Sequence, residues 1–264
     1  MANFSTMPDT DTDLDLPQIR RIRTSDLTEA LSKGVDDFRA MPTHAFFVAL
    51  IYPVLGAFIG AMVFGNNVLP LLFPMMAGFA LLGPVAAIGI YELSRRREQG
   101  RDITWSAASE VVRSPAIGSI VLLGLLLLAI FLVWLGVAQA LYQSIFGSYM
   151  PASLTAFLRE VLTTPQGWTL IIIGNAVGFV FSMMVLAISV FSFPMLVDRH
   201  VSAAVAIQTS IRAVGTNPGP MIAWGFIVAA LLAVGFIPFF FGLAVTLPIL
   251  GHATWHLYRR VVGP

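Results

Sequence analysis

The stretch PAIGSIVLLGLLLLAIFLVWLGV, residues 115–137, decides the fold of this chain. It carries no charged side chain and is as long as the roughly 20 apolar residues that cross about 30 Å of hydrocarbon. Because lipid offers no water to satisfy backbone N–H and C=O groups, an apolar run of this length must be helical. The sequence therefore predicts a membrane-spanning helix here, which could continue as helix to about Phe146.

Five further apolar segments flank this one, and charged residues fall only at their ends or between them. We predict an all-α, polytopic membrane helix bundle with six transmembrane helices, occupying residues 26–262 after a disordered cytoplasmic tail over residues 1–25. The other five predicted spans cover about residues 44–65, 71–93, 168–193, 219–236 and 239–258.

Composition agrees with a membrane protein. Hydrophobic residues make up 57% of the chain and charged residues 11%, against about 25% charged residues in a typical soluble domain. Cysteine is absent, which excludes disulfides, thiolate metal sites, CxxC redox chemistry and covalent c-type haem attachment. The lipid bilayer is therefore the first partner that we expect.

Basic residues predict the orientation of the spans. All the arginines and lysines except Arg159 precede the first span, follow the last, or lie in the loops after the second and fourth. By the positive-inside rule that side is cytoplasmic, so both termini are expected inside. The predicted location is the bacterial inner membrane.

Two short amphipathic stretches are predicted to lie on the membrane surfaces. Asp26 and Glu29 have capping-box spacing, and a helix from Asp26 would place four apolar residues on one face: Leu27, Leu31, Val35 and Phe38. On the outer side, residues 153–163 form a stretch too short to span and are expected as an interfacial helix. The acidic and basic tail before Asp26 is either a solvated segment near anionic headgroups or a docking arm for a partner.

An internal match suggests a repeat. Residues at the end of the second span align without gaps to residues at the end of the sixth: Gly78, Ala80, Pro84, Leu93, Arg95 and Arg96 to Gly242, Ala244, Pro248, Leu257, Arg259 and Arg260. We interpret the bundle as three hairpins in parallel orientation. Such repeats occur in transporters, although duplication can build any bundle.

Small and polar residues predict how the bundle packs. Gly56 and Gly60 form a GxxxG motif in the first span, and Gly174 and Gly178 form another in the fourth; this spacing lets helices approach closely. A polar stripe recurs every seven residues on the fourth span: Asn175, Ser182 and Ser189. It indicates either interhelical hydrogen bonds or the lining of a polar path.

Candidate chemical groups are few. His252 and His256 share one helix face and are weak metal-ligand candidates, or an interfacial anchor with one packed histidine. Glu92 lies one turn before Arg95 and is expected to form an ion pair at the cytoplasmic interface. We find no nucleophile–base pair, carboxylate pair or phosphate loop, and predict no catalytic residue, no cofactor and no nucleic-acid partner.

Three segments carry a resemblance to a known family: GFALLGP running to YELSR over residues 78–95, NPGP at 217–220, and GHATWHLYR at 251–259. They resemble a bacterial family of predicted integral membrane proteins filed as a domain of unknown function, over about residues 36–262. The resemblance implies a multi-pass inner-membrane protein without an established activity. Some members are labelled as a cytochrome c oxidase, but haem–copper catalysis needs histidines at mid-membrane on several helices. Here all four histidines lie near predicted cytoplasmic ends: His44, His200, His252 and His256.

Three functions follow as hypotheses. The first is a non-catalytic accessory or organising protein with a membrane protein partner, and the second is a transporter or handler of a lipid or small lipophilic solute. The third is a redox or metal protein that uses His252 and His256. A subunit associated with a respiratory oxidase is a further alternative.

Overall fold

The computed structural model describes residues 16–41, 69–81, 83–104, 110–199, 201–237 and 241–263. Over these residues the fold is helical, with one isolated antiparallel bridge between Ile19 and Val262. The predicted first span at 44–65, with Gly56, Gly60 and His44, lies outside the described residues, as does His200.

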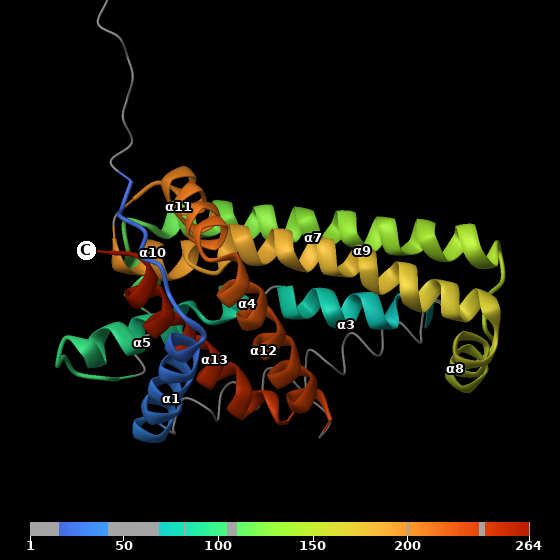
Figure 1. The fold of residues 1–264 in the computed structure, drawn as a ribbon, viewed down its shortest axis with the longest axis horizontal. Helices are drawn as coiled ribbons and strands as arrows, with labels where there is room; N and C mark the ends of the chain where they lie inside the picture. The colour runs from blue at the N-terminus through green and yellow to red at the C-terminus, as the bar shows by residue number, and fades with distance from the viewer. Residues whose placement is uncertain are drawn as a thin grey trace, which may run out of the picture.

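Three long apolar helices have the length and composition of membrane spans, and they confirm three of the predictions. They are α7 (Ile117–Phe146), α9 (Pro165–Ser189) running on into α10 (Ser192–Asp198), and α12 (Pro218–Phe236). The helices α7 and α9 lie side by side along the long axis of the molecule (Figure 1). At 30 residues, α7 is about 45 Å long, longer than the predicted span 115–137.

The described residues do not show the predicted second span as one long apolar helix. The described residues there form η1 (Leu69–Leu71), α3 (Leu72–Leu81), α4 (Gly83–Ala86) and α5 (Ile88–Glu98), with a turn at Ala87 between α4 and α5. Pro84 lacks a backbone N–H and its ring opposes the carbonyl four residues earlier, which favours the interruption of the helix by the turn at Ala87. Among the residues that the structure describes there, the longest apolar helical part, Leu69–Gly78, is shorter than a span.

The predicted sixth span corresponds to α13 (Leu243–Val261), which begins later than residue 239. It is not among the apolar spans because its second half carries polar and basic residues. That half is enclosed by protein, since Trp255 and Tyr258 are fully buried. The described residues therefore do not show six transmembrane helices as three hairpins.

Short amphipathic helices occur where the sequence predicts them. The outer stretch forms α8 (Leu154–Thr163), whose N-cap Ser153 accepts a hydrogen bond from the Ala156 N–H. The tail forms α1 (Thr24–Ala40), which starts two residues before Asp26. Helices α11 (Ala203–Thr216) and η2 (Glu110–Arg113) complete the set.

The main core lies at one end of the molecule, where α1, α5, α10 and α13 gather with the C-terminus (Figure 1). Phe191, Phe193 and Trp255 are completely buried there. The predicted cytoplasmic ends of α5, α10 and α13 thus lie together, which the charge pattern requires if they face one compartment. Helix α8 lies at the opposite end of α7 and α9.

Candidate functional site

Helix α1 packs antiparallel along α13, with Asp26 near Arg260 and Asp37 near His256. The contact is close because Gly34 faces backbone: a Cβ at this position would lie 2.7 Å from the Ile249 carbonyl oxygen. The buried residues of α1 are Leu27, Ala30, Gly34 and Asp37, whereas Leu31, Val35 and Phe38 of the predicted apolar face are half-buried. Small residues such as Ala30 and Gly34 lie at this contact because they let the backbone of α13 approach α1 closely.

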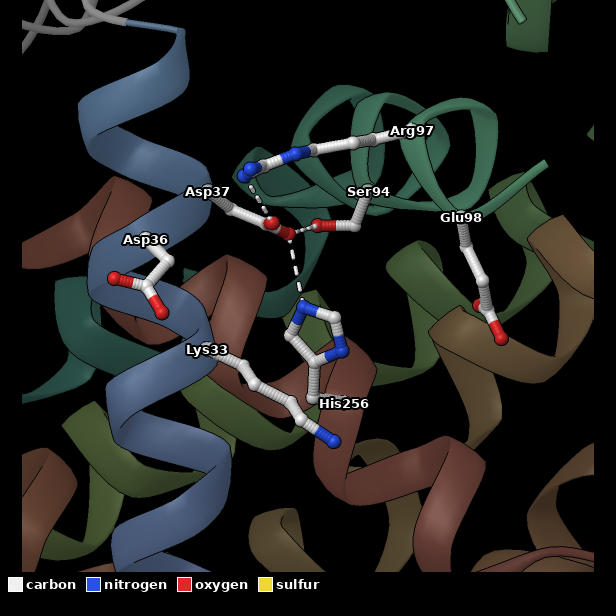
Figure 2. A pocket seen from close by; sticks show the side chains of 7 residues that line it. All are labelled: Lys33, Asp36, Asp37, Ser94, Arg97, Glu98 and His256. Carbon is white, nitrogen blue, oxygen red and sulfur yellow. Dashed lines mark hydrogen bonds and ion pairs between the residues drawn. The ribbon is translucent and has the colours of Figure 1, made fainter. Parts of the chain in front are cut away.

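This packing brings the Asp37 carboxylate between three helices, where the residue is 5% exposed. Its Oδ2 accepts hydrogen bonds from the Ser94 hydroxyl at 2.8 Å and from His256 Nε2 at 2.9 Å. Its Oδ1 accepts one from the Arg97 guanidinium at 2.6 Å. Figure 2 shows the three donors converging on the carboxylate from α5 and α13. The three side chains supply N–H or O–H donors, so the buried anion is compensated by hydrogen bonds.

His252 is a fourth polar side chain that joins these contacts, through Ser94. Ser94 Oγ lies 2.6 Å from His252 Nδ1, and His252 is 1% exposed. Because the Ser94 hydroxyl donates its only proton to Asp37, its oxygen can accept from a His252 Nδ1–H. A continuous hydrogen-bonded chain thus runs from His256 through Asp37 and Ser94 to His252. We call these four residues with Arg97 the Asp37 cluster.

The environment of Asp37 sets its charge. Burial acts to raise the pKa of this carboxyl, but hydrogen bonds from His256 and Ser94 and the nearby histidine charges outweigh it. The pKa therefore lies below its ordinary value of 3.8. Asp37 is ionised at neutral pH and acts as a fixed acceptor.

An open pocket of about 400 Å³ lies against the Asp37 cluster (Figure 2). Lys33 and Asp36 from α1 and Glu98 from α5 line it, together with four members of the cluster: Asp37, Ser94, Arg97 and His256. Charges of both signs stand around it. The pocket therefore suits a polar partner surface better than a purely anionic or cationic ligand.

A second charged group ties α5, α10 and α13 together. Asp198 accepts hydrogen bonds from the Tyr258 hydroxyl at 2.8 Å and from Arg259 at 3.3 Å. Glu98 accepts from Trp255 Nε1 at 3.1 Å and from Arg259 Nε at 3.2 Å. These contacts join the helix ends that the sequence predicted on one side of the membrane.

Glu92 forms the predicted ion pairs within α5. Arg96 Nε lies 2.8 Å and Arg95 lies 3.0 Å from its carboxylate oxygens. The second guanidinium nitrogen of Arg96 also pairs with Glu110 at the start of η2. Glu92 is 4% exposed. Through Arg96, which pairs with both Glu92 and Glu110, it helps to link α5 to η2.

Asn217 fixes the segment before α1. Its side-chain oxygen accepts from the Ile22 N–H at 2.9 Å, and its amide nitrogen donates to the Arg20 and Ala213 carbonyls at 3.1 Å. The Arg20 N–H also donates to the Val261 carbonyl. Residues 18–22 are therefore held by the rest of the fold, which differs from a disordered tail ending at residue 25.

The predicted stripe on α9 is distributed over three environments. Asn175 is exposed and lines an apolar pocket between α3, α7, α8 and α9. Ser182 is exposed, whereas Ser189 is buried and donates to the Val185 carbonyl.

The two described glycines of the predicted packing motif face α7. A Cβ on Gly174 would lie 3.8 Å from a Leu141 methyl, and one on Gly178 would lie 3.3 Å from the Trp134 ring.

The His252 and His256 pair is brought together with Asp37, but not as a ligand set. Among the residues that the structure describes, no group of three His, Cys, Asp or Glu side chains is arranged to hold a metal ion. His256 Nε2 is instead engaged by Asp37 and His252 Nδ1 by Ser94.

Sequence reasoning missed Asp37 and Ser94. Asp37 stands beside Asp36 in a polar stretch and has no feature that marks it as buried. The available signal was the spacing of Ala30 and Gly34, since small residues four apart identify a face for close helix contact. Asp37 follows Gly34 by three residues and so lies on that face.

Comparison with protein families confirms the resemblance over part of the chain. Residues 71–198 match the model of the family described as predicted integral membrane protein (DUF2189). The match includes the GFALLGP and YELSR segments, while NPGP and GHATWHLYR lie beyond it. Neither the curated proteins nor the solved structures gave a match.

Proposed function

We propose that this integral membrane protein is a non-catalytic accessory or organising component of the bacterial inner membrane, with its termini in the cytoplasm. One observation supports the proposal most directly. Charged side chains at the helix ends form ion pairs that join α1, α5, α10 and α13. The pocket beside the Asp37 cluster is open to the surface. A pocket whose rim carries charges of both signs, on helices joined by ion pairs, is suited to bind a partner protein in one orientation.

Purification in a mild detergent from the native membrane tests this proposal. A stable membrane protein partner should be recovered in a fixed ratio, and a respiratory oxidase is one candidate that the experiment would identify. Repeated isolation of the chain alone as a monomer would contradict the proposal.

A charge reversal sharpens the same experiment. Asp36→Lys changes the exposed rim of the pocket without touching the buried Asp37 contacts. It should reduce partner recovery several-fold. Glu160→Lys, on α8 at the opposite end, is the matched control and should leave recovery unchanged.

A second candidate function is the handling of a lipid or small lipophilic solute. It is favoured by the apolar pocket of about 280 Å³ that Asn175 lines. Transfer of a fluorescent phospholipid between vesicles, with and without the reconstituted protein, tests this candidate. A rate no higher than that of protein-free vesicles would count against it.

A further inference from the structure

The apolar pocket lies between four elements at the end of the bundle far from the Asp37 cluster. Its walls come from α3, α7, α8 and α9, and include Phe73, Trp134, Tyr142, Leu158, Ile171 and Asn175. At about 280 Å³, it is close to the lower end of the roughly 300–1,000 Å³ range of ligand pockets. Its size fits one chain or one small lipophilic molecule better than a whole phospholipid.

The polar groups of the wall are satisfied by the protein backbone. Trp134 Nε1 donates to the Pro74 carbonyl at 3.0 Å, and the Tyr142 hydroxyl donates to the Tyr149 carbonyl at 3.1 Å. The Asn175 amide nitrogen donates to the Ile171 carbonyl at 2.7 Å. With these donors engaged internally, the space offers mostly hydrocarbon to an occupant, and water gains few partners there.

The rim of the pocket is apolar and uncovered. Phe73 is 62% exposed, Leu162 is 56% exposed and Leu158 is 46% exposed. Because α7 and α9 have the length and composition of membrane spans and α8 is amphipathic, we expect this rim to face lipid at the edge of the bilayer. Ala138 and Gly174, which are small, keep the wall between α7 and α9 open.

The length of the pocket matches one leaflet. Its lining on α7 extends from Trp134 to Tyr142, eight residues and so about 12 Å of helix rise, against about 30 Å for the whole hydrocarbon core. We propose that this pocket binds a single hydrocarbon chain of a membrane lipid, inserted from the leaflet in which α8 lies. This inference rests on the second candidate function and names its ligand.

Fluorescence quenching by brominated lipid tests the proposal, because Trp134 forms part of the wall and is itself only 5% exposed. The protein and its Trp134→Phe variant are reconstituted in phosphatidylcholine vesicles with or without bromine at mid-chain. The difference between the two proteins isolates the Trp134 emission. A bound chain should quench more than half of it, and an unquenched Trp134 signal would overturn the proposal.

A filling variant and a control separate the pocket from general lipid contact. Gly174→Leu places a side chain in the pocket, since its Cβ would have only ordinary contact with Leu141, and should restore most of the Trp134 emission. Ala138→Val is a second filling variant if the first fails to fold. Gly136→Leu on α7, whose Cβ would meet nothing within 4 Å, should leave quenching unchanged. Equal quenching in filled and control variants would contradict a pocket-bound chain.

The quenching and transfer experiments distinguish the pocket-bound hydrocarbon chain from the proposed lipid-handling function. Quenching without lipid transfer between vesicles would support the bound chain and reject lipid handling. Transfer without quenching of Trp134 would support lipid handling and reject this pocket as its site.

Discussion

His256 Nε2 lies 2.9 Å from Asp37 Oδ2, although the two residues are 219 positions apart in the chain. The contact joins the helix that precedes the membrane region to the helix that ends it. The same carboxylate oxygen also accepts from Ser94 on α5. The Asp37 cluster is therefore the point at which three distant segments are fixed relative to one another.

The neutral substitution Asp37→Asn should destabilise the folded protein. An amide cannot accept from Ser94, Arg97 and His256 together, so at least one buried donor loses its partner, at a cost of about 1–3 kcal/mol. Chemical denaturation in detergent measures the loss. Asp36→Asn is the matched control, because Asp36 is exposed, and equal losses from the two variants would contradict a special role for Asp37.

Stability should depend on pH through Asp37. Its pKa is lowered in the folded state below the ordinary value of 3.8, so the unfolded chain takes up the proton first as the pH falls. Its contribution is complete above about pH 4 to 5 and declines as the pH falls through the folded pKa. The difference in unfolding midpoint between the wild-type protein and Asp37→Asn should be smaller below about pH 4 than at neutral pH. A difference that widened on acidification would contradict the assignment.

Gly34→Ala should weaken the contact between α1 and α13. The new Cβ would lie 2.7 Å from the Ile249 carbonyl oxygen, and overpacking against backbone costs about 1–3 kcal/mol. Trypsin should then cleave more rapidly after Lys33 and Arg39. The matched variant Gly215→Ala, whose Cβ would meet nothing within 4 Å, should be neutral or stabilising by up to about 1 kcal/mol. Similar protease sensitivity in both would argue against the close contact.

Labelling of introduced cysteines tests the predicted orientation, since the chain has no cysteine of its own. A membrane-impermeant maleimide should label Lys33→Cys in inverted vesicles and not in intact spheroplasts. Arg159→Cys on α8 should show the reverse. Labelling of both positions from one side would contradict the orientation that the positive-inside rule predicts.

Long apolar runs predicted α7, α9 and α12, because a single apolar segment in a bilayer can satisfy its backbone N–H and C=O groups only as a helix. The short apolar face of residues 153–163 likewise predicted α8. These features are local, so periodicity and composition identify them. The turn between α4 and α5 follows Pro84, and the sequence alone does not decide whether a proline in an apolar run kinks a helix or ends it.

The Asp37 cluster could be predicted only in part. Glu92 and its arginines are neighbours on one helix, so their ion pairs follow from spacing. The partners of Asp37 come from α5 and α13, and their meeting depends on which face of α1 is buried. Apolar periodicity identifies the face with Val35 and Phe38, but it does not reveal the close approach to α13 at Gly34, which buries Asp37.

Disulfide trapping tests the central claim most directly, namely that α1 folds onto α13 and places Asp37 beside His256. A Cβ at Gly34 would lie 2.8 Å from the Ala253 Cβ, so a small separation of the helices brings a cysteine pair to the roughly 3.8 Å that a disulfide prefers. In native membranes, Gly34→Cys with Ala253→Cys should cross-link on mild oxidation, as seen by faster migration that reductant reverses. Each single variant should not. Two accessible cysteines that stay uncross-linked under the same oxidation would contradict the claim.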